Sequence, residues 1–212
     1  MVLSSYSKIN LNLLVNSKQK SGLHNIQSYY CLINLKDKIK IKKINGKSDK
    51  INFTGPFSKF INKRDNSIKS ILVLLRKLKL ISSYYSVVVK KNIPVFAGLG
   101  GGTSNAFTVM KCVLRKKLSK KNLNIIEKKI GSDLELFFYK QGFLKGLGSI
   151  INQKIKQTFF FVLIKPPIKC STREIYSKIK RYSSQTAFSK KAAKKRTSFL
   201  NLLINSRNDL QS

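Results

Sequence analysis

The chain has 212 residues, of which 42% are apolar, so it is long enough to bury a core and too apolar for a disordered protein. Lys and Arg number 43 against 8 Asp and Glu, a formal net charge of +35. A single histidine and three distant cysteines (Cys31, Cys112 and Cys170) argue against a zinc site or a disulfide framework. Neither a signal peptide nor a membrane-spanning run is recognisable, so we expect a soluble, cytoplasmic protein without a membrane partner.

The positive charge has two explanations. A basic protein binds nucleic acid by displacing counterions from phosphates, which makes a nucleic-acid partner one interpretation. However, the lysines are spread along the whole chain together with many Ile, Asn and Ser residues, a combination that AT-rich codons produce whatever the function. We therefore favour compositional drift, and we expect the densest basic run, from Lys190 to Arg196, to be a solvated loop or helix face.

Short strands are predicted near the N-terminus. Residues Ile9–Leu13 alternate between apolar and polar with a period of two, which is typical of a strand. Two further strands are predicted at Tyr29–Leu35 and Ile39–Ile44. The polar run Lys36–Lys38 between them is interpreted as a turn.

The middle of the chain alternates helices with strands. Apolar residues at spacings of three and four predict a helix over Ser67–Leu80, followed by a strand at Tyr84–Val89. A second helix is predicted over Asn105–Leu118, with Thr103 or Ser104 as its N-terminal cap.

The C-terminal part is predicted to contain short elements and to begin after a break near residues 153–158. Phe159–Ile164 is interpreted as a buried strand that Pro166-Pro167 terminates. The other expected elements are helices at Asn122–Ile130, Ser171–Ile179 (capped by Ser171 or Thr172) and Ser198–Ile204, and strands at Leu136–Phe138 and Phe143–Leu147. The whole pattern indicates an α+β fold.

A glycine-rich loop between the strand at Tyr84–Val89 and the following helix is the most informative segment. Its glycines permit backbone conformations that Cβ atoms forbid, so its amides can converge on an anion at a helix N-terminus. The loop does not fit a Walker sequence or a dinucleotide fingerprint. We predict that it binds a nucleotide phosphate through Pro94, Val95, Phe96, Ala97, Gly98, Leu99, Gly100, Gly101, Gly102, Thr103 and Ser104.

This loop resembles the phosphate loop of the GHMP kinases, the group that includes galactokinase, homoserine kinase and mevalonate kinase. Further segments, in matching order across nearly the whole chain, narrow the resemblance to the 4-diphosphocytidyl-2-C-methyl-D-erythritol kinases. These segments are Ser7–Leu11, Gly22–Gln27, Asp65-Asn66, Ile130–Asp133, Ser171–Tyr176 and Asn208–Leu210.

The resemblance implies a GHMP kinase fold. Residues 1–157 would form a ribosomal-protein-S5-like N-terminal domain that binds ATP, and residues 158–212 part of a ferredoxin-like C-terminal domain. The chain ends just after Asn208–Leu210, so we expect the family's third, C-terminal glycine-rich motif to be absent, either because this is a fragment or because the gene is decaying.

The resemblance also implies a reaction and its residues. ATP, with Mg²⁺, would phosphorylate the 2-hydroxyl of a cytidine-diphosphate substrate in non-mevalonate isoprenoid biosynthesis. Asp133 would act as general base and Lys8 would stabilise developing charge. No metal-binding residue is predicted, and the protein would be a monomer or homodimer. Asn66 would contact the adenine side of ATP, and the substrate would be bound by Asn10, His24 and Tyr176.

The residues alone leave alternatives open. Without the resemblance, Asp133 is equally well explained as a turn or cap residue, and Lys8 does not differ from the other lysines. Leu23 replaces an aromatic residue of the family, a loss for which Tyr29 or Tyr30 would compensate. Other departures are Leu134-Glu135 in place of Val-Pro and Ser149 in place of glutamate. The remaining alternatives are another GHMP kinase and an inactive remnant that binds nucleic acid.

Overall fold

The computed structural model of the chain describes residues 2–20, 22–114, 117–146, 149–153, 157–166, 172–179 and 181–211. The chain folds into two compact units, each built from separated segments. The first unit comprises residues 1–8, 33–95 and 99–137, and the second comprises residues 9–32, 96–98 and 138–212. The predicted division at residue 157 into two family domains stays a prediction.

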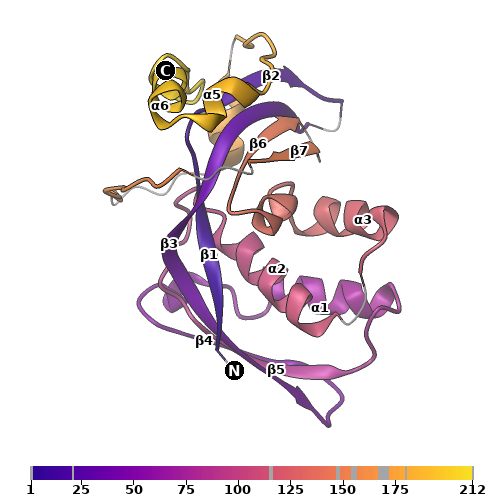
Figure 1. Cartoon of the computed structure of the whole chain (residues 1–212). Coiled ribbons are helices and arrows are strands. Elements are labelled where there is room, and N and C mark those ends of the chain that lie inside the picture. Colours follow the sequence, from indigo (N-terminus) through magenta and orange to yellow (C-terminus); the bar gives the residue numbers. More distant parts are fainter. Residues whose placement is uncertain are drawn as a thin grey trace. The chain divides into compact units, whose positions relative to one another are not determined.

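The elements follow one another as an α+β chain (Figure 1). Its strands are β1 (Val2–Asn10), β2 (Leu14–Lys18), β3 (His24–Ile44), β4 (Lys50–Thr54), β5 (Tyr84–Lys90), β6 (Gln141–Gly146) and β7 (Ser149–Asn152). Its α-helices are α1 (Ser67–Lys77), α2 (Gly101–Val113), α3 (Lys120–Ile130), α4 (Thr172–Ser177), α5 (Lys190–Lys194) and α6 (Arg196–Ile204), and two 3₁₀ turns are η1 (Ser58–Phe60) and η2 (Leu134–Phe138).

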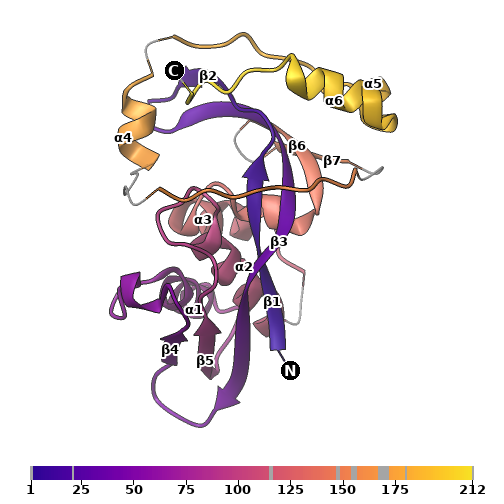
Figure 2. The same cartoon turned by 90° about the vertical axis from the view of Figure 1, so that its left-hand side faces the viewer.

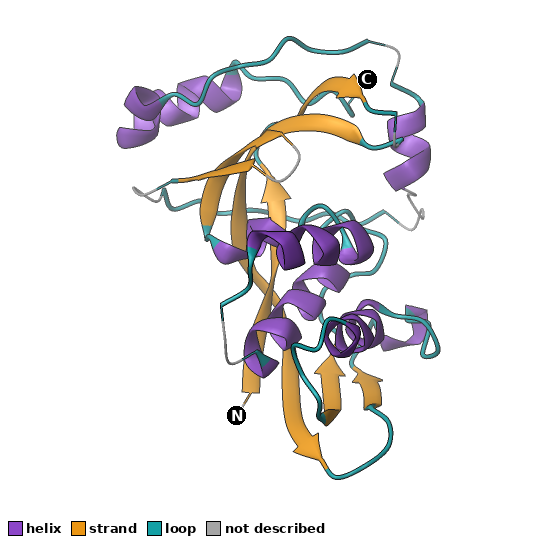
Figure 3. Cartoon of the chain, turned by 90° about the vertical axis from the view of Figure 1, so that its right-hand side faces the viewer, coloured by secondary structure: helices purple, strands orange, loops and turns teal. Residues whose placement is uncertain are grey.

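In the first unit, three helices cover a sheet. Strand β5 pairs antiparallel with β3 and parallel with β4, while β1 pairs with β3. Helices α1, α2 and α3 pack together on one side of these strands (Figures 1 and 3). The apolar stripe of α1 is buried as its spacing predicts, at Ile68, Ile71, Leu72 and Leu75. The predicted helix over Ser67–Leu80 and the strand at Tyr84–Val89 are therefore confirmed.

The predicted turn at Lys36–Lys38 is wrong, because β3 continues through it as one strand of 21 residues. Asp37 lies inside this strand and is completely buried, which its polar character does not suggest. Its carboxylate is instead satisfied by an ion pair with Lys91 and by two backbone N–H groups. A buried charge is tolerated when it is paired and hydrogen-bonded in this way.

Two further predictions in this unit need correction. Helix α2 begins at Gly101, earlier than predicted, and its N-cap is Gly100 with no side-chain cap, so Thr103 and Ser104 are not caps. The segment Leu136–Phe138 belongs to the 3₁₀ turn η2 and is not a strand. Helix α3 is confirmed, with Ser119 as its cap.

The second unit has a small aromatic core. Strands β2 and β6 pair with the first part of β3, and β7 pairs with β6. Tyr29 packs against Phe143, Phe188 and Phe199, with ring centroids 4.7, 5.9 and 5.1 Å away. Helix α6, which carries Phe199, confirms the predicted helix at Ser198–Ile204.

The predicted buried strand at Phe159–Ile164 is wrong. The segment is extended without being part of a strand (Figure 2), and Phe160, Val162 and Ile164 are 91%, 91% and 88% exposed. Only Phe159 packs against the aromatic core. Helix α4 confirms the predicted helix near Tyr176, while the proposed cap Ser171 lies outside the described residues.

No helix in the described parts of the chain has the length and apolar character needed to cross a membrane.

Candidate active site

The glycine loop owes its path to residues with positive φ. Gly98 and Gly100 both have φ of +68°, a left-handed conformation that glycine adopts without steric penalty. Phe96 takes the same conformation at φ +59°, although it carries a side chain. A Cβ on Gly100 would lie 3.1 Å from the ring of Phe137 and 3.2 Å from Cγ of Lys8. Gly100 is therefore required both for its backbone conformation and for the close approach of Lys8.

The N-terminus of α2 follows directly and provides amide donors. The first N–H groups of a helix have no partner within it, and in α2 these belong to Gly101, Gly102 and Thr103. The hydroxyl of Ser67, the first residue of α1, donates to the carbonyl of Gly102 at 2.7 Å. The sequence did not single out Ser67; its place beside the Asp65-Asn66 motif was the available signal.

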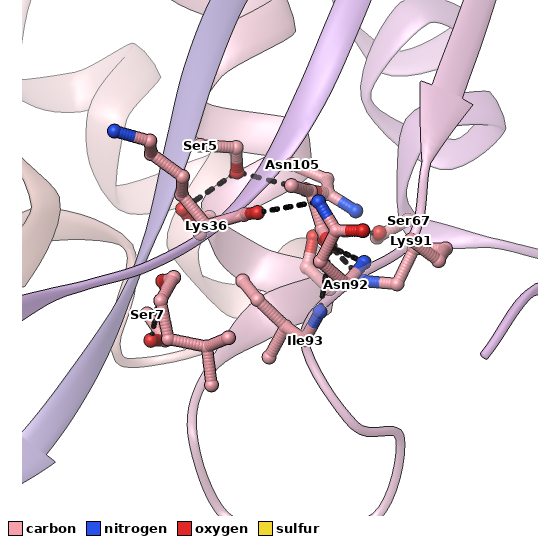
Figure 4. Close-up of polar contacts among 12 residues, drawn as sticks. Ser5, Ser7, Lys36, Ser67, Lys91, Asn92, Ile93 and Asn105 are labelled. Carbon is pink, nitrogen blue, oxygen red and sulfur yellow. Dashed lines mark hydrogen bonds and ion pairs between the residues drawn. The ribbon is translucent and has the colours of Figure 1, made fainter. Parts of the chain in front are cut away.

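Hydrogen bonds between polar side chains connect the first turns of α2 to β1. The hydroxyls of Ser5 and Ser104 are 2.8 Å apart, and Ser5 donates to Oδ1 of Asn105 at 2.7 Å. All three residues are buried, and Figure 4 shows Ser5 beside Asn105. Here the Ser104 hydroxyl is bonded to protein, whereas Thr103 lies against Gly131, where a Cβ would be 3.1 Å from Oγ1 of Thr103.

The two predicted catalytic residues lie together in the first unit. Nζ of Lys8 is 3.2 Å from Oδ2 of Asp133, and the two side chains are 8% and 29% exposed. The backbone N–H of Lys8 donates to the carbonyl of Leu99 in the glycine loop at 3.0 Å. Asp133 follows the end of α3 at Gly131, whose φ of +145° ends the helix. The glycine loop, a cation and a carboxylate thus share one site.

Two more carboxylates lie near Asp133 in sequence. Glu127 on α3 is half-buried, and its Oε1 has no hydrogen-bond partner among the described residues. Burial, and secondly the charge of Glu135, raise the pKa of Glu127 to about 7. Lys120 partly compensates, with its Nζ 3.4 Å from Oε1 of Glu135. This group of acids was not predicted from the sequence.

Asn66, predicted to lie on the adenine side of ATP, is the N-cap of α1. Its Oδ1 accepts from the backbone N–H of Lys69 at 3.0 Å, a bond that stabilises the first turn. Asn10, a predicted substrate residue, is half-buried at the end of β1. Its predicted role, like that of Asn66 towards adenine, stays a prediction.

The predicted cytidine residues meet in the second unit. His24 at the start of β3 and Tyr176 on α4 stack with ring centroids 5.1 Å apart and an interplanar angle of 29°. Burial, and secondly the charge of Lys18, lower the pKa of His24. Leu23 beside them is 49% exposed. Tyr29 and Tyr30 are buried, so they do not supply the aromatic face that Leu23 lacks.

The residues of the first unit fit a phosphate group with its magnesium ion. The unpaired amides of Gly101, Gly102 and Thr103 at the N-terminus of α2 supply donors for an anion, and the two glycines carry no side chain that could stand between these amides and a ligand. Mg²⁺ in kinases is usually held by one or two carboxylates together with the substrate phosphates. Asp133 is a carboxylate of this site, and among the described residues no group of three or more His, Cys, Asp or Glu is arranged so that it could hold a metal ion.

Comparison with known proteins places these features in a family. Residues 66–139, which include the glycine loop and Asp133, match the model of the GHMP kinases N-terminal domain. The chain is 41% identical over 186 residues to a 4-diphosphocytidyl-2-C-methyl-D-erythritol kinase of Pelagibacter ubique (strain HTCC1062), covering 85% of this chain and 66% of that protein. The kinase of the same name from Francisella tularensis subsp. tularensis (strain WY96-3418) is 34% identical, over 88% of this chain and 68% of its own length.

Solved structures agree on the fold. A crystal structure of 4-(cytidine 5'-diphospho)-2C-methyl-D-erythritol kinase superposes with a TM-score of 0.67 at 19% identity, covering all of this chain and 76% of the other. Homoserine kinase from Cytophaga hutchinsonii superposes with a TM-score of 0.55 at 14% identity, covering 95% and 64%. The present chain spans about two thirds of the length of the curated relatives it matches.

Proposed function

Because the chain belongs to the 4-diphosphocytidyl-2-C-methyl-D-erythritol kinases, a family of GHMP kinases, we propose that it transfers the γ-phosphate of ATP to the 2-hydroxyl of 4-diphosphocytidyl-2-C-methyl-D-erythritol. The products are ADP and the 2-phosphate ester. This reaction is a step of non-mevalonate isoprenoid biosynthesis. A cytoplasmic location and a monomeric or dimeric state remain predictions.

One observation carries this proposal. Lys8 and Asp133 form an ion pair, and the Lys8 side chain passes close to Gly100, at the N-terminus of the helix that follows the glycine loop. Phosphoryl transfer depends mainly on positioning and on electrostatic stabilisation, so it needs few reactive groups. A helix N-terminus, one ammonium group and one carboxylate supply those groups.

Each residue has a defined task in the proposed reaction. The amides of Gly101–Thr103 hold the phosphates. Mg²⁺, when bound with ATP, would neutralise part of the phosphate charge. Asp133 accepts the proton of the substrate 2-hydroxyl. The oxygen of that hydroxyl bonds to the γ-phosphorus as the bond between this phosphorus and the leaving ADP oxygen breaks. Lys8 stabilises the negative charge that develops during transfer.

The pair formed by His24 and Tyr176 supports a cytidine-containing substrate. An aromatic ring beside an imidazole offers a stacking face and a hydrogen-bonding group, which a nucleobase uses together. A sister GHMP kinase with a small alcohol substrate has no use for such a pair. 2-C-methyl-D-erythritol 4-phosphate, which lacks the cytidyl group, should therefore be a poor substrate.

The test is ATP-dependent phosphorylation of the cytidyl substrate by the whole chain and by Asp133→Asn, an isosteric variant without a basic carboxylate. We expect kcat to fall about 100-fold to 10,000-fold in Asp133→Asn, with ATP binding retained. Lys8→Met should lower kcat by a similar order, whereas Lys111→Met, at an exposed lysine of α2, should not.

Three results would contradict the proposal. Full activity of Asp133→Asn would exclude Asp133 as the base. Transfer to homoserine or mevalonate in preference to the cytidyl substrate would assign the chain to a different GHMP reaction. Binding of RNA with a steep salt dependence, and no binding of ATP, would favour a nucleic-acid-binding protein built on a kinase fold.

A further inference from the structure

A carboxylate is buried in the middle of β3. Asp37 is 0% exposed, and its Oδ1 accepts hydrogen bonds from the backbone N–H groups of Asn92 (2.7 Å) and Ile93 (2.9 Å). Its Oδ2 pairs with Nζ of Lys91, which is 2% exposed. The carboxylate therefore binds three consecutive residues, 91 to 93. A buried ion pair often adds little to the net stability of a protein. The contacts of the pair between Asp37 and Lys91 therefore point to a different role, which is to hold residues 91 to 93 in place.

Residues 91 to 93 are held from a second direction as well. The backbone N–H of Lys91 donates to the carbonyl of Thr54 at 2.7 Å, at the end of β4. The side chain of Asn92 donates to the carbonyl of Lys36 at 3.0 Å, and Figure 4 shows this contact with Lys91 and Ile93 beside it. The segment that leaves β5 is thus fixed on both sides just before the glycine loop begins at Pro94.

Ile93 contacts the first turn of helix α2, so its position affects where that turn lies. It is completely buried, and its Cγ2 lies 3.0 Å from the point where a Cβ on Gly101 would be. Nζ of Lys91 lies 3.4 Å from the same point. With so little space, the location of Ile93 decides how closely the first turn of α2 can approach β5 and where its N–H groups point.

We propose that Asp37 is a positioning residue for nucleotide binding. By holding the amides of Asn92 and Ile93, it fixes the first turn of α2, whose N–H groups receive the phosphates of ATP. The inference rests on the proposed function in assuming that this loop binds ATP. Binding and catalytic groups must be held close to their productive geometry by residues behind them, and displacement by about 1 Å is enough to weaken them strongly.

A second carboxylate in the same unit provides a matched control. Asp49 accepts a hydrogen bond from the backbone N–H of Tyr85 at 2.9 Å and pairs with Arg76, again in a largely buried position. Tyr85 is the second residue of β5, whereas Asn92 lies two residues beyond the last one, Lys90. The two ion pairs share their chemistry, and they differ in that only the pair at Asp37 leads into the glycine loop.

The experiment compares charge-balanced double variants of the whole chain. Asp37→Leu with Lys91→Met removes the ion pair and the acceptor of the two amides of Asn92 and Ile93. Asp49→Leu with Arg76→Met removes the ion pair and the acceptor of the Tyr85 amide at the other end of β5. Asp37→Asn with Lys91→Met restores an acceptor oxygen without the charge. The dissociation constant of a non-hydrolysable ATP analogue with Mg²⁺ is measured by calorimetry, and unfolding by urea is measured in parallel.

We expect Asp37→Leu with Lys91→Met to raise the dissociation constant about tenfold or more. The control pair at Asp49 should lose stability and change the dissociation constant by less than about twofold, and the Asn variant should recover most of the affinity. In steady-state kinetics the KM for ATP should rise more than the KM for the alcohol substrate. If the Leu variant does not fold, Asp37→Glu is compared with Asp49→Glu. Both variants keep the negative charge, and the longer side chain shifts the backbone N–H groups that donate to the carboxylate.

The outcomes separate this inference from the proposed function. Unchanged affinity in the Asp37 variants, or equal losses at Asp37 and Asp49, would overturn the inference even if the wild-type chain phosphorylates the cytidyl substrate. A selective loss of affinity at Asp37 would support it even if no phosphate is transferred to that substrate. A wild-type chain that binds no nucleotide would overturn it outright.

Discussion

In the first unit, charged groups are buried between strands and helices, whereas in the second unit an apolar segment lies exposed. Asp37 and Lys91 are almost completely inaccessible because each is the other's partner. Phe160, Val162 and Ile164 are about as exposed as side chains can be, because no strand or helix among the described residues covers them. The contrast shows that the partners available to a residue decide its burial as much as its own polarity does.

The largest effect of a substitution is expected at the glycine loop, where the residues of the first unit are closely packed. Gly100→Ala would force a side chain into a left-handed conformation and against Phe137 and Lys8. We expect a loss of about 2 to 3 kcal/mol in the free energy of unfolding and a large loss of ATP binding. Gly102→Ala is the control, because its Cβ would meet only Ser67 Oγ at 3.5 Å and alanine favours a helix. Equal effects of the two substitutions, measured by urea unfolding, would contradict the described geometry.

Glu127 is the exception in the first unit, since its buried Oε1 has no partner among the described residues. Its folded pKa of about 7 lies above the unfolded value of 4.5, so the folded state holds the proton more tightly. The contribution of Glu127 to the free energy of unfolding is therefore most favourable below pH 4.5 and is lost as the pH rises through about 7. Glu127→Gln should remove this dependence and stabilise the chain at about pH 8 by roughly 1 kcal/mol, a value reduced for partial exposure.

Unfolding by urea at several pH values measures this effect. The wild-type chain, unfolded at the same pH values, is the reference. A Glu127→Gln variant with the wild-type pH profile would show that the carboxylate is well hydrated in solution.

Periodic elements and the family could be predicted from the sequence, because helix α1 and strand β5 carry their pattern locally. The predicted turn around Asp37 is wrong because the partners of Asp37 lie 54 to 56 residues further along the chain. Phe159–Ile164 was misread as buried for the opposite reason, since six apolar residues cannot indicate whether a neighbouring strand exists. Both errors concern long-range partners, which a local pattern does not contain.

The candidate site was predictable to the extent that motifs of the family identify it. Lys8 and Asp133 were named only through the resemblance, and the structure places them 3.2 Å apart. The bonds of Ser67 to Gly102 and of Ser5 to Ser104 were not predicted, because ordinary serines give no signal of their partners. The glycine pattern predicts that the loop uses conformations closed to other residues, but it does not indicate that positive φ occurs at Gly98 and Gly100 and not at Gly101 or Gly102.

The smallest effect is expected in the exposed segment of the second unit. Phe160→Ser removes an aromatic ring that is 91% exposed, so the free energy of unfolding should change by less than about 0.5 kcal/mol. Phe159→Ser is the matched control one residue earlier: its ring lies 6.1 Å from that of Phe199, and its loss from the aromatic core should destabilise by about 2 kcal/mol or more. Because exposed extended apolar segments favour association between chains, Phe160→Ser should also reduce concentration-dependent light scattering. A destabilisation by Phe160→Ser equal to that of Phe159→Ser would mean that in solution another part of the chain or a second copy covers the segment, and the contrast between the two units would then disappear.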